Sequence, residues 1–101
     1  MTYRPLPLCV TVTNSAIEGL GLFAIENIPV GFEFGISHIL DERFENGYIR
    51  TPLGGFINHS AEANCETVVD NDGFVRIKSV VEINVGDEIT LRYNLYEVNR
   101  I

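Results

Sequence analysis

Short apolar segments recur about every ten residues along the chain, and Gly, Asn, Asp and Pro separate them. Residues 8–13, 65–69 and 74–81 are rich in β-branched side chains, and residues 32–36 alternate apolar with other side chains. No amphipathic helix is evident, and residues 41–46 are long enough for only one helical turn within a loop. These features predict an all-β fold of short strands with little helix.

The sequence predicts two kinds of turn. Residues 71–73, Asn-Asp-Gly, separate two of the predicted strands, and Asp-Gly supplies the positive φ of a tight hairpin turn. Residues 28–34 and 83–89 share the pattern Ile-x-Val-Gly-x-Glu-apolar, which is expected to form a glycine turn that leads into a strand. We therefore expect one β-hairpin at residues 71–73 and two paired, similarly built β-units.

Length and charge limit the class of protein. The 101 residues, 46% of them hydrophobic, suffice for one core, so a single domain over residues 1–101 is expected. Neither a long apolar run nor a secretory signal is evident, which predicts an intracellular protein, cytoplasmic or nuclear if eukaryotic, with no membrane segment.

A net charge of −7 disfavours direct nucleic-acid binding. The same charge would attract a lysine-rich peptide, although a negative surface commonly serves only solubility.

The sequence offers no metal site and no hydrolase site. Cys9 and Cys65 lie outside any Cys-x-x-Cys or Cys/His cluster, so buried free thiols are expected, with a disulfide as the alternative. His59 and Ser60 are adjacent, and neighbouring side chains on a strand point to opposite faces, which excludes a Ser-His triad built from this pair. His38 has no partner among the spaced motifs and is predicted to be an exposed strand residue.

Three motifs could carry chemistry. In the first, Gly19, Leu20 and Gly21 precede an apolar strand, and glycine permits close approach of the backbone to a ligand. In the second, an apolar strand is expected to end at Asn58 and His59, whose amide and imidazole groups can read a ligand by hydrogen bonds. A tight turn and a polar strand cap are the corresponding structural interpretations.

The third motif lies near the end of the sequence. It runs Gly-Asp-Glu-Ile-Thr over residues 86–90 and continues to Tyr93, so that a glycine turn leads into a strand that ends in tyrosine. A strand tyrosine is commonly a core residue with a solvated hydroxyl, which is the alternative here.

Taken in order, the three motifs resemble those of the SET-domain lysine methyltransferases. The resemblance covers residues 17–96 and depends most on Asn-His-Ser at residues 58–60 together with the later Gly-Asp-Glu-Ile-Thr. It implies a β-clip type fold of small curved sheets whose C-terminal segment passes through a loop, which is a pseudoknot and a rare arrangement.

The resemblance also implies a role for each motif. The cofactor would be S-adenosyl-L-methionine, and the substrate would be a lysine of a protein or peptide. Tyr93 matches the catalytic tyrosine of the family, at the bottom of a narrow lysine channel. The cofactor-binding residues would be Gly19, Leu20 and Gly21 along its methionine part, and Asn58 and His59 by hydrogen bonds.

The chain also departs from the family pattern. Gly55 and Ala61 stand where members often have arginine and cysteine, and the insert between the first two motifs is shortened. A cysteine-rich zinc cluster after Tyr93 is not expected, so Tyr96 or a second subunit of a homodimer would have to cover the channel. Two other functions remain open: a SET-like module that binds peptide without methylating it, and a β-rich structural or oligomerisation domain.

Overall fold

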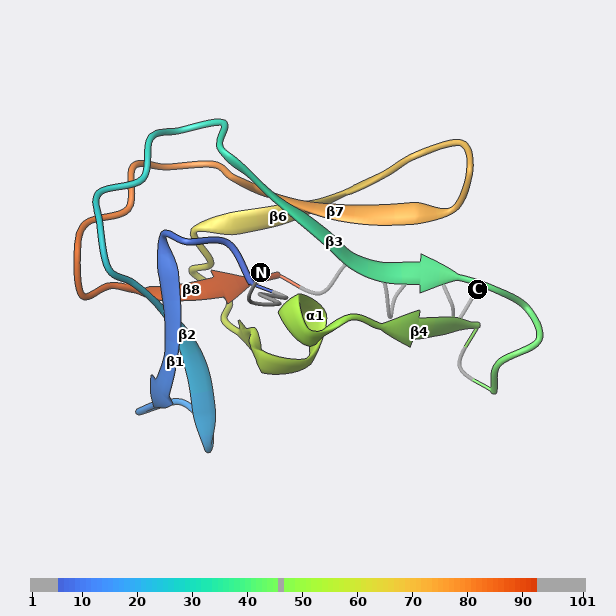
Figure 1. Cartoon of the computed structure of the whole chain (residues 1–101), viewed down its shortest axis with the longest axis horizontal. Helices are drawn as coiled ribbons and strands as arrows, with labels where there is room; N and C mark the ends of the chain where they lie inside the picture. The colour runs from blue at the N-terminus through green and yellow to red at the C-terminus, as the bar shows by residue number, and fades with distance from the viewer. Residues whose placement is uncertain (1–5, 46, 93–101) are drawn as a thin grey trace, which may run out of the picture.

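The computed structural model describes residues 6–45 and 47–92, and within them it has eight strands and one short helix (Figure 1), which confirms the all-β prediction. The elements, in chain order, are β1 Val10–Asn14, β2 Leu20–Ala24, β3 Glu33–Leu40, β4 Tyr48–Arg50, α1 Pro52–Phe56, β5 Asn58–His59, β6 Cys65–Val69, β7 Phe74–Ser79 and β8 Glu88–Leu91.

The strands form one curled sheet in the order β1-β2-β8-β6-β7-β3-β4, and β5 also pairs with β8. Most neighbours are antiparallel, but β8 runs parallel to both β5 and β6. In Figure 1 the β1–β2 hairpin extends to one side, β3, β6 and β7 run across the top, and α1 lies in the middle between β8 and β4. Strand β8 therefore joins the β1–β2 hairpin to the rest of the sheet.

The two echoed turns pair with each other. Ile28 and Ile83 exchange both backbone hydrogen bonds, at 2.8 and 2.9 Å. The Gly31 amide donates to the last residue of β7 at 2.9 Å, and the Gly86 amide donates to the last residue of β2 at 2.8 Å. Both glycines have positive φ, 83° and 91°. The units β2-turn-β3 and β7-turn-β8 thus make reciprocal contacts, as the repeated sequence pattern predicted.

The Asn-Asp-Gly segment forms the predicted hairpin turn. Gly73 has a φ of 87°, and the Asp70 amide donates to the Phe74 carbonyl at 2.9 Å. Strands β6 and β7 are antiparallel on either side of this turn, with Val69 opposite Val75. The main core lies beneath this hairpin and the two echoed units, and its buried apolar members come from both units, including Leu22, Ile28, Phe34, Ile77, Ile83, Ile89 and Leu91.

The segment before Asn58 is a helix, and the strand predicted there is wrong. Thr51 caps the helix N-terminus by accepting from the Gly54 amide at 3.4 Å, and Pro52 has no amide hydrogen to leave unpaired in the first turn. A Cβ on Gly54 would overlap the Ser37 carbonyl oxygen of β3. The glycine lets α1 pack directly onto the sheet, and a run of only five helical residues leaves no periodic pattern in the sequence.

The prediction that His38 is exposed is also wrong. Its side chain is fully buried in β3, where Nδ1 lies 2.8 Å from the Ser37 hydroxyl oxygen and the ring meets Tyr48 edge-on at 5.1 Å. Burial, with a smaller contribution from the Arg50 charge, lowers the pKa of His38 to about 4. Helix α1 covers this part of β3, and the missed helix is therefore the reason for the wrong prediction.

Cys9 and Cys65 are buried free thiols, as predicted. Burial raises the pKa of both thiols, to about 12 for Cys65.

No group of three or more metal-ligating side chains occurs in residues 6–45 and 47–92. In the same residue ranges, no helix has both the length and the apolar character needed to cross a bilayer. The predicted pseudoknot involves residues outside the described ones and stays a prediction.

Candidate functional site

Strand pairing brings the second and third motifs side by side. Asn58 and His59 of β5 lie opposite Thr90 and Leu91 of β8. The Asn64 side chain extends this contact, because its Oδ1 accepts from the Thr90 amide and its Nδ2 donates to the backbone of β8, each at 2.8 Å. The two motifs therefore lie side by side where β8 runs parallel to β5.

The first motif joins them through one side chain. Asn58 Nδ2 lies 3.1 Å from the Glu18 carbonyl oxygen and 3.2 Å from that of Leu20. Gly19, between those two carbonyls, has a φ of 47°, which favours glycine and turns the backbone into β2. The structure thus brings together Gly19, Leu20, Asn58 and His59, four of the residues singled out in the sequence.

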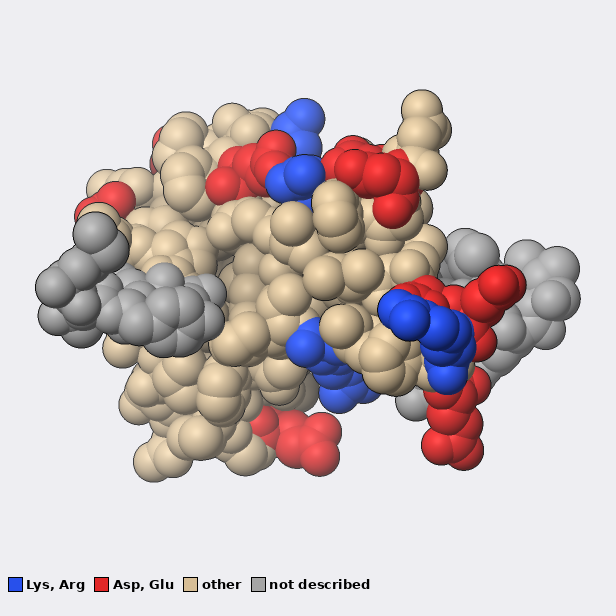
Figure 2. Space-filling model, turned by 45° about the vertical axis from the view of Figure 1, so that its right-hand side comes forward, with Lys and Arg blue, Asp and Glu red and all other residues tan. Residues whose placement is uncertain are grey.

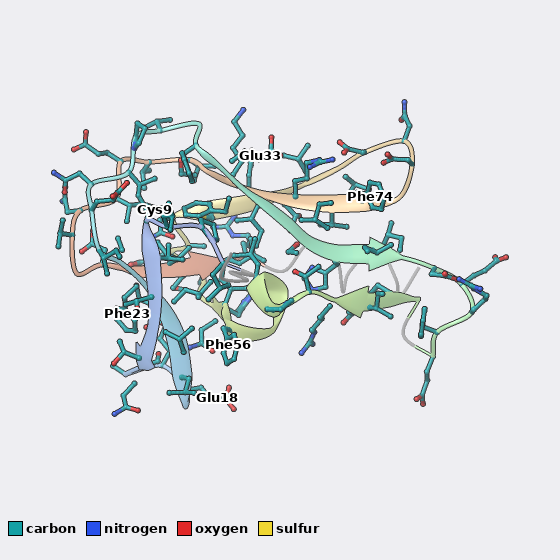
Figure 3. The ribbon with its side chains drawn as sticks, viewed as in Figure 1. Cys9, Glu18, Phe23, Glu33, Phe56 and Phe74 are labelled. Atoms are coloured by element: carbon teal, nitrogen blue, oxygen red, sulfur yellow. The ribbon has the colours of Figure 1, made fainter. Side chains whose placement is uncertain are left out.

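These four residues line a cavity of about 490 Å³. Its described walls are residues 18–20, Arg50 and residues 55–59, and Figure 3 shows Glu18 and Phe56 on the same side of the molecule, beside the tips of β1 and β2. A Cβ added to Gly19 or Gly55 would meet no atom within 4 Å, so both glycines border open space. The volume falls in the range of small-molecule sites.

The cavity wall combines charged and apolar side chains. Glu18 and Arg50 supply one negative and one positive charge, while Leu20 and Phe56 are 49% and 37% exposed and supply apolar surface. Such a wall suits a small ligand that carries both charged groups and apolar surface. The sequence analysis gave Glu18, Arg50 and Phe56 no role. Glu18 and Phe56 stand next to the residues singled out in the first two motifs, and Arg50 comes from the short strand β4.

Gly21 is placed differently. It is buried, it is not among the described residues that line the cavity, and a Cβ there would overlap a carboxylate oxygen of Glu88. Gly21 therefore allows β2 to approach the Glu88 side chain of β8. Its contact with a cofactor stays a prediction.

A polar cluster lies behind the cavity wall. The Ser15 hydroxyl oxygen is 2.8 Å from both carboxylate oxygens of Glu88, and Asn58 Nδ2 is 2.9 Å from one of them. The Ser15 oxygen also accepts from the Ile17 amide at 2.9 Å. This cluster ties the loop before Gly19 to β5 and β8. Glu88 stands in the third motif, but nothing in the sequence pointed to Ser15.

Tyr93, the predicted catalytic residue, lies outside the described residues. It follows Arg92 in sequence, and the last residue of β8, Leu91, is paired with His59. The position of Tyr93 relative to the cavity and its catalytic role stay predictions.

Charged side chains on the molecular surface are mixed in sign. Figure 2 shows several small groups of charged side chains, some of which contain both acidic and basic residues, on a face that is mostly uncharged. The described ion pairs agree with this: Arg76 binds Asp70 and Glu33, and Arg43 binds Asp41. The net negative charge is therefore not concentrated in one acidic patch on that face.

Comparison with known proteins identifies the fold. The structure is similar to that of Plasmodium falciparum PFL0690c, a candidate histone methyltransferase, with a TM-score of 0.67 and 19% identity over 84% of this chain and 92% of the other. It is also similar to the methyltransferase domain of human PR domain-containing protein 2, with a TM-score of 0.71 and 19% identity over 88% of this chain and 79% of the other.

A second structure of that relative, the SET domain of the RIZ1 tumor suppressor (PRDM2), gives a TM-score of 0.69 and 19% identity over 90% of this chain and 72% of the other. No curated protein matches in sequence. The family model described as SET domain matches residues 36–94, which is more than half of the chain and includes the second and third motifs. With the fold and the family match in agreement, the chain belongs to the SET domain family.

Proposed function

We propose that the protein transfers a methyl group from S-adenosyl-L-methionine to a lysine side chain of a protein or peptide substrate. The observation that carries the proposal is the cavity in which the glycine turn at Gly19 and the pair Asn58 and His59 meet, within a SET domain. The family supports methyltransferase chemistry, and the cavity supports a small-molecule cofactor.

The residues present fit this cofactor. The cavity is large enough, and the glycines at 19 and 55 leave open space on its wall. The loop at Gly19 and Leu20 would lie along the amino-acid part of the cofactor, Asn58 and His59 would hydrogen-bond it, and apolar surface from Phe56 would cover its ring. When bound, S-adenosyl-L-methionine supplies a methyl group activated by the sulfonium. Gly21 would act through the close approach of β2 to Glu88.

The residues of the chain would then act on the lysine. A lysine amine is protonated at neutral pH and must lose its proton before it becomes a nucleophile, and an apolar channel lowers its pKa. The Tyr93 hydroxyl would align the neutral amine by a hydrogen bond. Positioning is therefore the main contribution asked of the protein.

A basic protein or peptide is the substrate class that we propose. The net charge of −7 favours encounter with a cationic segment. Either Tyr96 or the second subunit of a homodimer would cover the lysine channel, and the homodimer is part of the proposal.

The direct test is methyl transfer. The protein is incubated with S-adenosyl-L-methionine carrying a labelled methyl group and with a panel of lysine-rich proteins, and the label is followed into protein. We expect transfer to at least one substrate and retention on lysine after hydrolysis. Cofactor binding without transfer to any member of the panel would contradict the proposed function, and an absence of cofactor binding would instead favour the SET-like module that binds peptide without methylating it.

Tyr93→Phe tests the proposed catalytic residue. Loss of one hydroxyl with retention of the ring should lower kcat by about 10-fold or more, with cofactor affinity unchanged. An unchanged kcat would exclude Tyr93 from the mechanism.

A further inference from the structure

The polar cluster behind the cavity determines which way the Asn58 amide faces. Its nitrogen has four oxygen atoms within reach: Glu88 Oε2 at 2.9 Å, the Ser15 hydroxyl at 3.1 Å, the Glu18 carbonyl at 3.1 Å and the Leu20 carbonyl at 3.2 Å. A rotated amide would set its own oxygen against a carboxylate and two carbonyls, none of which can donate. The nitrogen must therefore face the cluster.

The Ser15 hydroxyl strengthens this preference. It donates to the Glu88 carboxylate and accepts from the Ile17 amide, so its hydrogen is committed to the carboxylate. A rotated Asn58 amide would find no donor there either. Glu88, which is half-buried and carries the negative charge of the cluster, is the group to which both other side chains donate.

The oxygen of the same amide is available to a ligand. Asn58 lines the cavity, and within residues 6–45 and 47–92 its Oδ1 accepts no hydrogen bond. A fixed acceptor of this kind matches the ammonium group of an α-amino acid, which carries three donors and no acceptor. We infer that Glu88 is a positioning residue: it holds the Asn58 amide so that Oδ1 faces the cavity and selects a cofactor that carries an α-ammonium group. The inference rests on the proposed function, which supplies such a cofactor.

Glu88→Gln is the variant that tests this role. The glutamine keeps the size of the side chain but brings an NH₂ group that can donate to Asn58 Oδ1, so both orientations of the Asn58 amide become possible. The matched control is Glu33→Gln. Glu33 occupies the same place in the echoed turn-strand pattern as Glu88, its side chain is 53% exposed and pairs with Arg76, and Figure 3 shows it on the opposite side of the molecule from Glu18 and Phe56.

The measurement is calorimetric binding of two ligands, S-adenosyl-L-methionine and an otherwise identical analogue without the α-amino group. Glu88→Gln should weaken binding of the first by about 10-fold or more, because a hydrogen bond to a charged group is lost, and should change binding of the analogue by less than about 2-fold. Glu33→Gln should bind both ligands as the original protein does.

A second readout needs no ligand. The side-chain amide protons of Asn58, followed by NMR in the ligand-free protein, should exchange slowly with solvent in the original protein and faster in Glu88→Gln. If Glu88→Gln folds poorly, Gly21→Ala is the second variant. Its Cβ would overlap the Glu88 carboxylate and lie 3.1 Å from Asn58 Nδ2, so it disturbs the contact between the two side chains while the charge is kept. It should show the same selective loss.

The binding results that would contradict the role of Glu88 differ from the result that would contradict the proposed function. Equal weakening of both ligands by Glu88→Gln would mean that the carboxylate only supports the fold, and unchanged affinity would mean that it does not position Asn58. Either result leaves the proposed function intact. If the original protein does not bind S-adenosyl-L-methionine, the proposed function is wrong and so is the ligand assigned to Oδ1. Faster exchange of the Asn58 amide in Glu88→Gln than in the original protein would still establish its contact with Glu88.

Discussion

Burial keeps the His38 imidazole neutral inside the sheet. The side chain is fully inaccessible, Nδ1 meets the Ser37 hydroxyl, and Nε2 has no hydrogen-bond partner within the part of the chain that the structure describes. Charging this ring would place a cation in an apolar region next to the positive charge of Arg50. The folded structure therefore favours the neutral form of the His38 imidazole.

Acid should destabilise the protein through His38. The pKa of His38 falls from 6.5 to about 4 on folding, so the unfolded state takes up the proton first. This contribution to stability is complete above pH 6.5 and is lost as the pH falls from 6.5 towards 4, by up to about 3 kcal/mol. Urea unfolding at a series of pH values measures the change.

The control for this experiment is His38→Phe, which keeps a ring of similar size without a titrating group. Its stability should vary much less over the same pH range. Asp41 does not confound the result, because its bond to Arg43 lowers its pKa to about 2 and its contribution is lost only below its ordinary value of 3.8. A variant that follows the original pH curve would rule out His38 as the cause.

Helix α1 owes its position to one of two adjacent glycines. Gly54 faces β3, where a Cβ would overlap the Ser37 carbonyl and approach the His38 ring at 3.2 Å. Gly55 faces the cavity side, where a Cβ would meet nothing within 4 Å. Both have negative φ, so steric space alone distinguishes them.

Replacement of each glycine by alanine should therefore have opposite effects on stability. Gly54→Ala should cost about 2 kcal/mol or more, because the Ser37 backbone cannot move without shifting β3. Gly55→Ala should stabilise the protein by up to about 1 kcal/mol, because alanine favours the helical conformation. Thermal or urea unfolding of the two variants provides the comparison, and equal effects would contradict the packing described for α1.

At this scale the sequence predicted what is local and missed what depends on distant contacts. The limits of β6, Cys65–Val69, agree with the prediction, because the hairpin turn is encoded by neighbouring residues. Strand β3 extends beyond the predicted residues 32–36 to Leu40, since its second half gains pairing with β4. The two-residue strand β5 exists only because β8 lies beside it, which no local pattern can reveal.

The site follows the same rule. Gly19, Leu20, Asn58 and His59 were predicted to belong together from the order of the motifs, and the structure places them around one cavity. Their individual roles towards a cofactor stay predictions. Arg50 reaches this cavity only through the pairing of β4 with β3, and a three-residue strand carries no recognisable signal in the sequence.

The molecule as a whole is held together by the reciprocal contact between the two echoed units. Ile28 and Ile83 are both fully or almost fully buried, at 1% and 0% exposure, and they bond to each other at the centre of the main core. Val75 belongs to a second, smaller cluster with Tyr48. The main core and the second cluster should therefore contribute separately to stability.

A double-mutant cycle tests this arrangement. Ile28→Ala and Ile83→Ala should each cost about 2–5 kcal/mol, and the double variant should differ from their sum by at least about 0.5 kcal/mol, because the two side chains share one part of the core. Ile28→Ala combined with Val75→Ala should be additive within about 0.5 kcal/mol. Additivity in both pairs would mean that the echoed turns do not act as one unit.

The position of β8 has a consequence for the order in which the protein can be assembled during synthesis. Until that strand emerges, β2 and β6 each present an open edge of unpaired amides and carbonyls, and the strand pairing that joins them in one sheet is missing. A nascent chain at that stage is open to wrong pairing with a neighbouring chain. Strand β8, the last described strand, is the one whose pairing completes the sheet.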